Sequence, residues 1–354
     1  MTDNAGKHSF GFIYGEKQGN LLFTLSELIK RHTTSPEMEF ICFPLTEINF
    51  NTMQAFAAVI TDGGIVQGTR PVPDIIYNFV YHTRLESIRA MHKLRTCEGI
   101  TVINPVNRFN QSFIFQILQA FPQSDQFLLP FTTLNSVSLS EYIKKYDNLF
   151  LLPDRGLSQK NAIRVVRLPA GMASIHTGVH ETICNMEELY ATILKMTSGK
   201  RYMLVKGADM LLSNGIPLQA RVYAQKNESG FWTISGSAAK TDVFSFGSIY
   251  GDMCEGLDTA LSRLNPLLAD ESYKGVYDIT SNLCSYLEYY LISIGSLTFD
   301  FIISKTGQPF VLQVRGFEQS FHSKALMDIC YNNAVKYMSF IEKSEYLDSG
   351  PGEG

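Results

Sequence analysis

Short apolar runs alternate with amphipathic segments along the first third of the chain. Runs bounded by turn residues predict strands at Ser9–Tyr14, Phe40–Phe43, Ala57–Ile60, Asp74–Asn78 and Thr101–Asn104. Apolar positions at helical spacing predict helices at Leu21–Arg31 and about Thr83–Cys97. Strands that alternate with helices indicate βαβ units and a parallel sheet. We therefore expect residues 1–125 to form an open N-terminal α/β domain.

After about residue 125, the predicted strands follow one another through short turns. These strands are Leu149–Leu152, Ala162–Val166, Ala173–His176, Tyr202–Val205, Leu218–Gln225, Phe231–Ala239, Leu297–Ile303 and Pro309–Val314. Helices are predicted at Met186–Met196, Tyr273–Ile294 and Ser323–Ile341. Adjacent strands joined by tight turns are antiparallel. The pattern therefore predicts a small α+β lobe at 126–200, a second lobe at 201–345 and a disordered tail at 346–354.

The composition narrows the class of protein. Of 354 residues, 45% are hydrophobic and 18% are charged, which is enough apolar material for a buried core. The 30 basic and 34 acidic residues give a net charge of −4, which argues against nucleic acid or an anionic membrane as a partner. The polar start of the chain does not read as a signal peptide, and no apolar run approaches the ~18 residues of a membrane span. Six scattered cysteines without a CxxC pair favour a reducing, cytoplasmic location.

Four segments together resemble the YheC/YheD family, which has the ATP-grasp fold. Pro73–Asn78 (PDIIYN), with Arg84 following, resembles the signature of the N-terminal domain of that family. Asn148–Val166 is similar to its lysine-proline strand, glycine-rich loop and next strand, and Ile216–Ala239 to two later strands. Phe299–Gly316 (FDFIISKTGQPFVLQVRG) resembles its metal-binding hairpin. The resemblance implies a pre-ATP-grasp-like N-terminal domain followed by a two-lobed ATP-grasp fold.

The resemblance also implies a chemistry and a location. ATP-grasp enzymes use ATP to activate a carboxylate as an acyl-phosphate, which an amine or a similar nucleophile then attacks. That reaction needs cations on the nucleotide phosphates and Mg²⁺ held by oxygen ligands. The family is named for its association with the endospore coat, so spore-coat proteins are candidate partners. A nucleotide is the candidate ligand, and the sequence identifies no substrate.

The last predicted hairpin departs from the family pattern. A two-residue turn at Thr306-Gly307 would place residue 303 opposite residue 310 and Asp300 opposite Gln313. Arg315 would share their face, because it lies two residues beyond Gln313. The resemblance implies that these three positions bind magnesium, but Gln313 is neutral and Arg315 is a permanent cation. We therefore predict that the magnesium site is lost, although Asp300 and Gln313 remain its candidate ligands, and that Arg315 forms an ion pair with Asp300.

The predicted phosphate site is also altered. The phosphate-contacting lysine of the family corresponds to Leu152, and the following loop keeps only Gly156. Lys160 and Arg155 are candidates to replace the lost positive charge.

Other candidate binding residues come from the later strands. Val205 and Lys206 correspond to the segment whose backbone contacts adenine. Arg221 matches a family arginine that could bind a phosphate or an acyl-phosphate, and it is the candidate catalytic residue. Lys240 stands where the family has an arginine at the end of the next strand. An ordinary structural role is the alternative for both Arg221 and Lys160.

Three hypotheses about function follow. The first is a degenerate ATP-grasp protein that serves as a non-catalytic binding or structural component. The second is an active ATP-dependent carboxylate-amine ligase with rearranged residues. The third is a nucleotide-binding protein without a metal, in which Arg315 supplies the counter-charge. The loss of two metal-ligand types and one phosphate lysine from one cleft favours the first.

Overall fold

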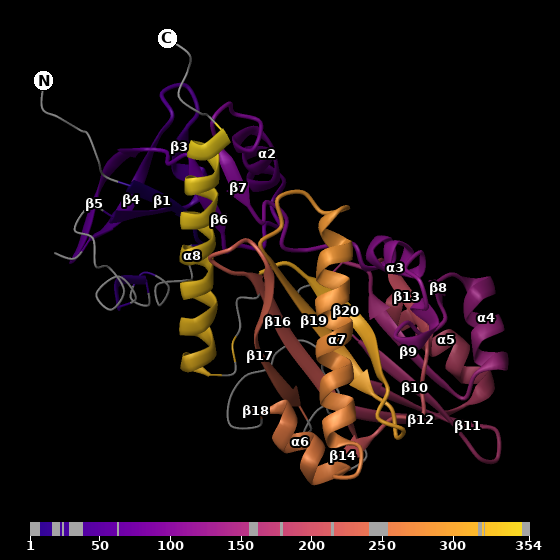
Figure 1. The fold of residues 1–354 in the computed structure, drawn as a ribbon. Helices are drawn as coiled ribbons and strands as arrows, with labels where there is room; N and C mark the ends of the chain where they lie inside the picture. The colour runs from indigo at the N-terminus through magenta and orange to yellow at the C-terminus, as the bar shows by residue number, and fades with distance from the viewer. Residues whose placement is uncertain are drawn as a thin grey trace, which may run out of the picture.

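The computed structural model describes residues 8–15, 22, 25–27, 38–61, 64–155, 162–177, 180–213, 216–240, 254–317, 321 and 323–348. In the elongated molecule the first and second sheets lie at opposite ends with the third sheet between them, and the long helix α8 runs beside the first and third sheets (Figure 1). The predicted helix at Leu21–Arg31 lies largely outside the described residues, as does most of the predicted tail. Among the described helices, none combines the length and the apolar character needed to cross a bilayer.

The first sheet has the strand order β3-β4-β2-β1-β6-β7, with β5 added beside β4. Its elements are β1 (His8–Ile13), β2 (Met38–Phe43), β3 (Ile48–Asn49), β4 (Gln54–Thr61), β5 (Gly64–Pro71), β6 (Ile75–Asn78), α2 (Leu85–Leu94) and β7 (Thr101–Ile103), with a short 3₁₀ helix at Leu45–Glu47. Strands β2, β1, β6 and β7 are parallel, as predicted. Strand β4 is antiparallel to both β2 and β5, so the sheet is mixed rather than wholly parallel.

The second sheet is antiparallel throughout, in the order β12-β11-β10-β9-β13-β8. Its strands are β8 (Phe131–Thr133), β9 (Asn148–Pro153), β10 (Ile163–Leu168), β11 (Met172–Thr177), β12 (His180–Asn185) and β13 (Tyr202–Lys206). Helices α4 (Ser136–Lys145) and α5 (Met186–Thr197) supply apolar side chains to the core on one face.

The third sheet has the order β18-β17-β16-β19-β20. Its strands are β16 (Gln219–Lys226), β17 (Trp232–Lys240), β18 (Cys254–Glu255), β19 (Ser296–Ile303) and β20 (Pro309–Arg315), and a small hairpin of β14 (Leu212–Ser213) and β15 (Ile216–Pro217) precedes them. The helices of this part are α3 (Gln111–Gln119), α6 (Leu257–Leu264), α7 (Ala269–Glu288) and α8 (Lys324–Asp348), with a 3₁₀ turn at Ser124–Gln126.

The two faces of the third sheet have different chemistry. Apolar residues such as Val222, Phe299 and Val314 lie in the same core cluster as Val276 and Leu283 of α7. The opposite face carries polar residues on all four long strands, and these side chains are also buried. A sheet that is buried on both faces must pair or hydrogen-bond every polar group on them.

Helix α8 joins the first and third sheets. In Figure 1 it runs beside β6 and extends toward β16. Leu326, Tyr331 and Met338 of α8 are buried in one cluster with Tyr77 of β6 and Tyr223 of β16. The predicted helix at Ser323–Ile341 is therefore present and extends to Asp348.

Several elements were not predicted from the pattern. Strands β5 and β12 and helices α3, α4 and α6 fall in segments that carry polar residues or short apolar runs. Strand β5 is mostly exposed, so it lacks the apolar run by which a buried strand is recognised.

Three buried asparagines tie the first sheet to the third. The side-chain oxygen of Asn104 accepts hydrogen bonds from the backbone N–H groups of Gly295 (2.8 Å) and Ser296 (2.9 Å). Its amide nitrogen donates to Asn107 Oδ1 and to Ser296 O, both at 3.0 Å. The amide nitrogen of Asn107 donates to Asn78 O at 2.7 Å. These side chains therefore connect the carboxyl ends of β6 and β7 to the start of β19.

Replacing Asn104 by glycine should destabilise the protein by about 3 kcal/mol or more, because the buried N–H groups of Gly295 and Ser296 lose their acceptor. Glycine is the informative substitute, since Asn104 has a φ of 54° that alanine would adopt only with strain. Urea unfolding measures the change. The control is Gln123→Gly, an exposed position with a φ of 59°, where we expect almost no change. Equal stability of the two variants would contradict a structural role for the asparagine network.

Candidate functional site

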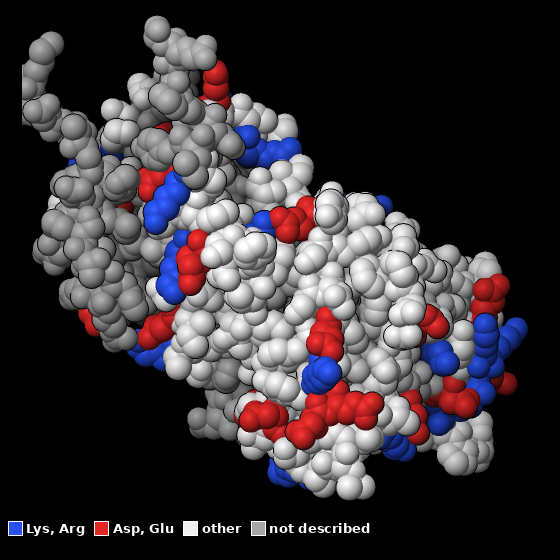
Figure 2. Space-filling view, in the orientation of Figure 1, with Lys and Arg blue, Asp and Glu red and all other residues white. Residues whose placement is uncertain are grey.

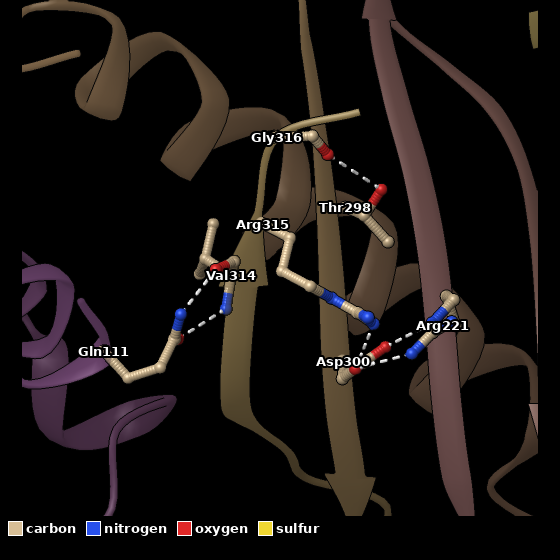
Figure 3. A network of polar contacts seen from close by, with 7 residues as sticks. All are labelled: Gln111, Arg221, Thr298, Asp300, Val314, Arg315 and Gly316. Carbon is tan, nitrogen blue, oxygen red and sulfur yellow. Dashed lines mark hydrogen bonds and ion pairs between the residues drawn. The ribbon is translucent and has the colours of Figure 1, made fainter. Parts of the chain in front are cut away.

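A buried carboxylate, Asp300 of β19, accepts hydrogen bonds from two guanidinium groups (Figure 3). Arg221 of β16 binds it with both nitrogens of its fork, Nε–Oδ1 at 2.6 Å and Nη2–Oδ2 at 2.9 Å. Arg315 of β20 donates from Nη2 to Oδ2 at 2.7 Å. The exposed fractions are 1% for Arg221, 4% for Asp300 and 3% for Arg315, so the three charges are removed from bulk water. Both carboxylate oxygens are thus occupied by arginine.

Strand register brings these groups together. Arg221 lies directly opposite Asp300 across the β16–β19 pair, and Gln313 lies opposite Asp300 on the other side. Arg315 pairs with Thr298, two residues from Asp300, and its long side chain reaches the carboxylate diagonally. The predicted contact between Arg315 and Asp300 is therefore present. The contact from Arg221 was not predicted.

The hairpin that carries Asp300 differs from its prediction at the turn. Ser304 N donates to Gln308 O at 2.9 Å, so three residues rather than two form the loop, with Gly307 at a φ of 83°. Ile303 consequently pairs with Pro309, and the predicted pairing of residue 303 with residue 310 is wrong. A bulge between Asp300 and Phe301 restores the register. The predicted pairing of Asp300 with Gln313 is therefore confirmed.

Two arginines determine the ionisation state of Asp300. Burial would raise the pKa of this carboxyl, but the guanidinium groups of Arg221 and Arg315 outweigh burial and lower its pKa below the usual value. Asp300 is consequently ionised at neutral pH. Both guanidinium groups that contact it are permanent cations.

These residues do not fit a magnesium ion. Mg²⁺ is held in octahedral geometry by oxygen ligands, usually with one or two carboxylates. Asp300 directs both oxygens to arginine, Gln313 is neutral, and Arg315 is a cation at the third family position. A divalent cation would have to bind beside two guanidinium cations that already contact the carboxylate, so we derive no chemistry through a metal here.

Gln313 and Lys240 complete the polar end of this face. Gln313 is 5% exposed, and its Oε1 atom has no hydrogen-bond partner within the described part of the chain. Lys240 is 7% exposed at the end of β17, opposite Gln219 of β16. Because Gln219 is two residues from Arg221, Lys240 extends the same positively charged face.

The phosphate side of the expected cleft is apolar. Leu152 of β9 is buried in one cluster with Phe150 and Val205, so no cation replaces the family lysine at that position. Arg155 is exposed, and Lys160 lies outside the described residues. The side chain of Lys206 lies over the ring of Tyr146, with Nζ at 5.6 Å from its centroid.

The backbone of Lys206 is engaged as well. Its N–H donates to Pro130 O at 2.8 Å, and Val205 pairs with strands on both of its sides. An adenine contact with this particular N–H would therefore require its hydrogen bond to Pro130 to break, and the predicted contact with the backbone of this segment stays a prediction.

Gln111, which the sequence did not single out, links the two sides of the site. Its side chain extends the edge of β20, donating to Val314 O (2.8 Å) and accepting from Val314 N (3.0 Å), as Figure 3 shows. Its backbone N–H donates to Asp154 O at 3.0 Å, just beyond β9. The ends of β9 and β20 are therefore held close to each other by one residue.

The comparisons with known proteins agree with this architecture. A sequence model of the YheC/D-like ATP-grasp family matches residues 99–341, which is more than half of the chain. The protein belongs to this family. The Pro73–Asn78 segment that resembles the N-terminal signature precedes the matched residues.

Individual relatives of this YheC/D-like protein are distant. The endospore coat-associated protein YheD of Bacillus subtilis (strain 168) is 22% identical over 313 residues, which cover 84% of this chain and 67% of YheD. D-alanyl-alanine synthetase A from Vibrio cholerae has a TM-score of 0.51 at 11% identity, covering 95% of this chain and 97% of its own. VanG D-Ala:D-Ser ligase from Enterococcus faecalis has a TM-score of 0.53 at 9% identity, covering 94% and 99%. These structures confirm the ATP-grasp fold.

Replacing Asp300 by asparagine should destabilise the protein by about 3–5 kcal/mol at pH 7, because two buried guanidinium groups lose their counter-charge. The difference from wild type should be full above the ordinary aspartate pKa of about 3.9 and should shrink as the pH falls through the lower pKa of folded Asp300. The effect has this sign because, as the pH falls, the Asp300 carboxyl is protonated in the unfolded chain before it is protonated in the folded protein. Urea unfolding from pH 7 down to acid measures it.

The matched control is Asp209→Asn. Asp209 pairs with Lys305 at 2.9 Å on the surface, where the two side chains are 79% and 59% exposed. An exposed pair of this kind contributes less than about 1 kcal/mol. A cost for Asp300→Asn no greater than that of the control would contradict the buried-charge description.

Proposed function

We propose that this protein is a non-catalytic member of the YheC/D-like ATP-grasp family, serving as a binding or structural component. The observation that carries the proposal is the occupation of both Asp300 oxygens by Arg221 and Arg315. Phosphoryl transfer in ATP-grasp enzymes relies on magnesium to bring the phosphates together and neutralise them. Arginine side chains can neutralise charge, but they offer a phosphate no metal coordination.

Further support comes from the other departures in the cleft. Gln313 is a neutral residue in place of an acidic ligand, and Leu152 is apolar in place of a phosphate lysine. Each change removes a group that transfer chemistry needs, and both replacement side chains are buried. An active ligase with rearranged residues is the alternative, with Arg221 as its catalytic candidate.

Binding of a nucleotide without a metal is the second candidate function. The cationic side chains of Arg315 and Lys240 on one face of the third sheet favour it, since guanidinium and ammonium groups are suitable ligands for phosphate oxygens. Arg315 and Lys240 would then contact the phosphates, with help from Lys160. In this function ATP is a ligand rather than a substrate.

Association with the spore coat is the proposed setting. It is supported by the likeness to YheD, which is described as endospore coat-associated. Spore-coat proteins would then be partners, with a cytoplasmic location before assembly. We expect no role for nucleic acid or for a membrane, given the net charge of −4.

A thermal scan with ATP separates the candidate functions. Under the main proposal, millimolar ATP should leave the melting temperature unchanged with or without magnesium. A ligand at 100 times its Kd would add about 2.7 kcal/mol of stability, which such a scan detects readily. A shift that needs no magnesium would select the metal-free nucleotide binder. A magnesium-dependent shift with release of ADP would instead show an active enzyme and refute the main proposal.

Restoring the family pattern with the double change Gln313→Glu and Arg315→Asn should create magnesium-dependent ATP binding. The new carboxylate and the loss of one guanidinium would make the cluster acidic, as a magnesium site requires. We expect little turnover, because Leu152 still lacks its lysine. ATP titrations with and without magnesium measure the effect.

The control for this variant is Gln308→Glu with Arg263→Asn, which changes the net charge equally at positions outside the Asp300 cluster. It should bind no ATP in a magnesium-dependent way. If the Gln313/Arg315 variant binds ATP equally with and without magnesium, the proposal that Arg315 has replaced the metal is wrong.

A further inference from the structure

Two adjoining cavities lie outside the Asp300 cluster, at the carboxyl end of the first sheet. The α2 cavity, of about 350 Å³, is bounded by α2 and the segment after β7, including His82, Arg95 and Arg108. The α7 cavity, of about 270 Å³, shares Arg95, Val106 and Arg108 with it and extends to the residues that follow α7. Sites for small molecules in proteins have volumes of this order.

The charged side chains that line these cavities are arginines. Arg95 and Arg108 line both cavities, and neither lining includes a carboxylate. The Nε atom of Arg108 is buried and has no hydrogen-bond partner among the described residues. Burial lowers the pKa of Arg108, and repulsion from Arg155 lowers it further. A guanidinium nonetheless stays protonated, and within the described residues no carboxylate pairs with that of the partly buried Arg108.

His82 adds a neutral polar group to the α2 cavity. The amide nitrogen of Asn78 donates to Val80 O and Asn104 O, which directs Asn78 Oδ1 toward His82 Nε2 at 3.1 Å. His82 Nε2 is therefore the protonated nitrogen of the ring. Burial lowers the pKa of His82 to about 4, so the ring is neutral at pH 7.

The walls of both cavities are mainly apolar. Ile88 and Met91 line the α2 cavity, while Phe113 and Leu291 line the α7 cavity. Ile88 and Phe113 are about half exposed, at 48% and 53%. Figure 2 shows a mostly uncharged surface along the upper part of α7, with one group of acidic and basic residues beside its upper end. An apolar wall beside a pair of guanidinium groups suits an amphipathic anion.

We propose that these cavities bind a small molecule with one oxyanion head, a carboxylate or a phosphate, attached to an apolar or aromatic body. Arg108 and Arg95 bind the head through their guanidinium donors, as these forks match the geometry of both anions. The apolar body lies against Val106, Ile88 and Phe113. These cavities lie outside the Asp300 cluster, and the proposed binding does not require that the protein binds ATP.

Isothermal titration with three matched probes tests the proposal on the full chain. We expect 2-naphthoate or 2-naphthyl phosphate to bind with a Kd below about 1 mM, and neutral 2-naphthylmethanol to bind at least about tenfold more weakly. The tighter of the two anions identifies the head group. The absence of binding by both anions, or equal binding of the neutral probe, would overturn the proposal.

Variants locate the site. Arg108→Gln and Arg95→Gln should each weaken binding of the anionic probe at least about tenfold while leaving the neutral probe unaffected. Arg89→Gln removes an exposed charge from α2, outside both linings, and should bind as wild type does. Val106→Trp at a 48% exposed position should block the site without loss of stability. Unchanged affinity in both Arg95 and Arg108 variants would show that the probe binds elsewhere.

Discussion

The buried carboxylate of Asp300 imposes the main electrostatic constraint on this protein. A carboxylate in the middle of a sheet that is covered on both faces is stable only beside positive charge. Here that charge comes from Arg221 and Arg315 on the two neighbouring strands, which hydrogen-bond to the carboxylate. Both cations are part of the chain and cannot dissociate from the site. The fold therefore needs no ion to balance Asp300. Where metal ligands occupy these positions, the charge of the carboxylate is balanced instead by a bound metal ion, which can dissociate.

The neutral side chain of Gln313 belongs to the same balance. It lies directly opposite Asp300, and a second carboxylate there would bring two like charges side by side unless a metal separated them. With Arg315 already directed at Asp300, the amide adds no further charge to the cluster. The residues at positions 313 and 315 are thus coupled. Without a metal, an arginine at 315 balances Asp300, and a neutral residue at 313 avoids a second carboxylate beside it.

The sequence indicated which residues of the hairpin would meet, because neighbouring strands joined by a short turn fix each other's register. It did not indicate that Arg221 would bind Asp300. The two residues lie on β16 and β19, which pair in the sheet but are far apart along the chain. Gln111 and Asn104 were also missed, because sequence alone does not distinguish a buried residue that makes hydrogen bonds from a polar residue in an exposed loop. The three-residue loop was missed for a related reason. A compensating bulge leaves the pairing of Asp300 with Gln313 unchanged, so the pattern of apolar residues does not distinguish the two turns.

Asn107 connects the cavities beside α2 to the strand that carries Arg315. It lines the α2 cavity, its backbone oxygen accepts from Gly316 N at 3.0 Å, and its side-chain oxygen accepts from Phe317 N at 2.7 Å. Gly316 leaves no room for a Cβ at this approach, because Asn107 Oδ1 would lie 2.4 Å from it. The wall of the cavity and the end of β20 therefore form one tightly packed unit. A buried amide that makes several hydrogen bonds holds its neighbours in one arrangement more strictly than apolar packing does. The position of Arg315 at the end of β20 therefore depends on contacts with the segment after β7 as well as on the third sheet.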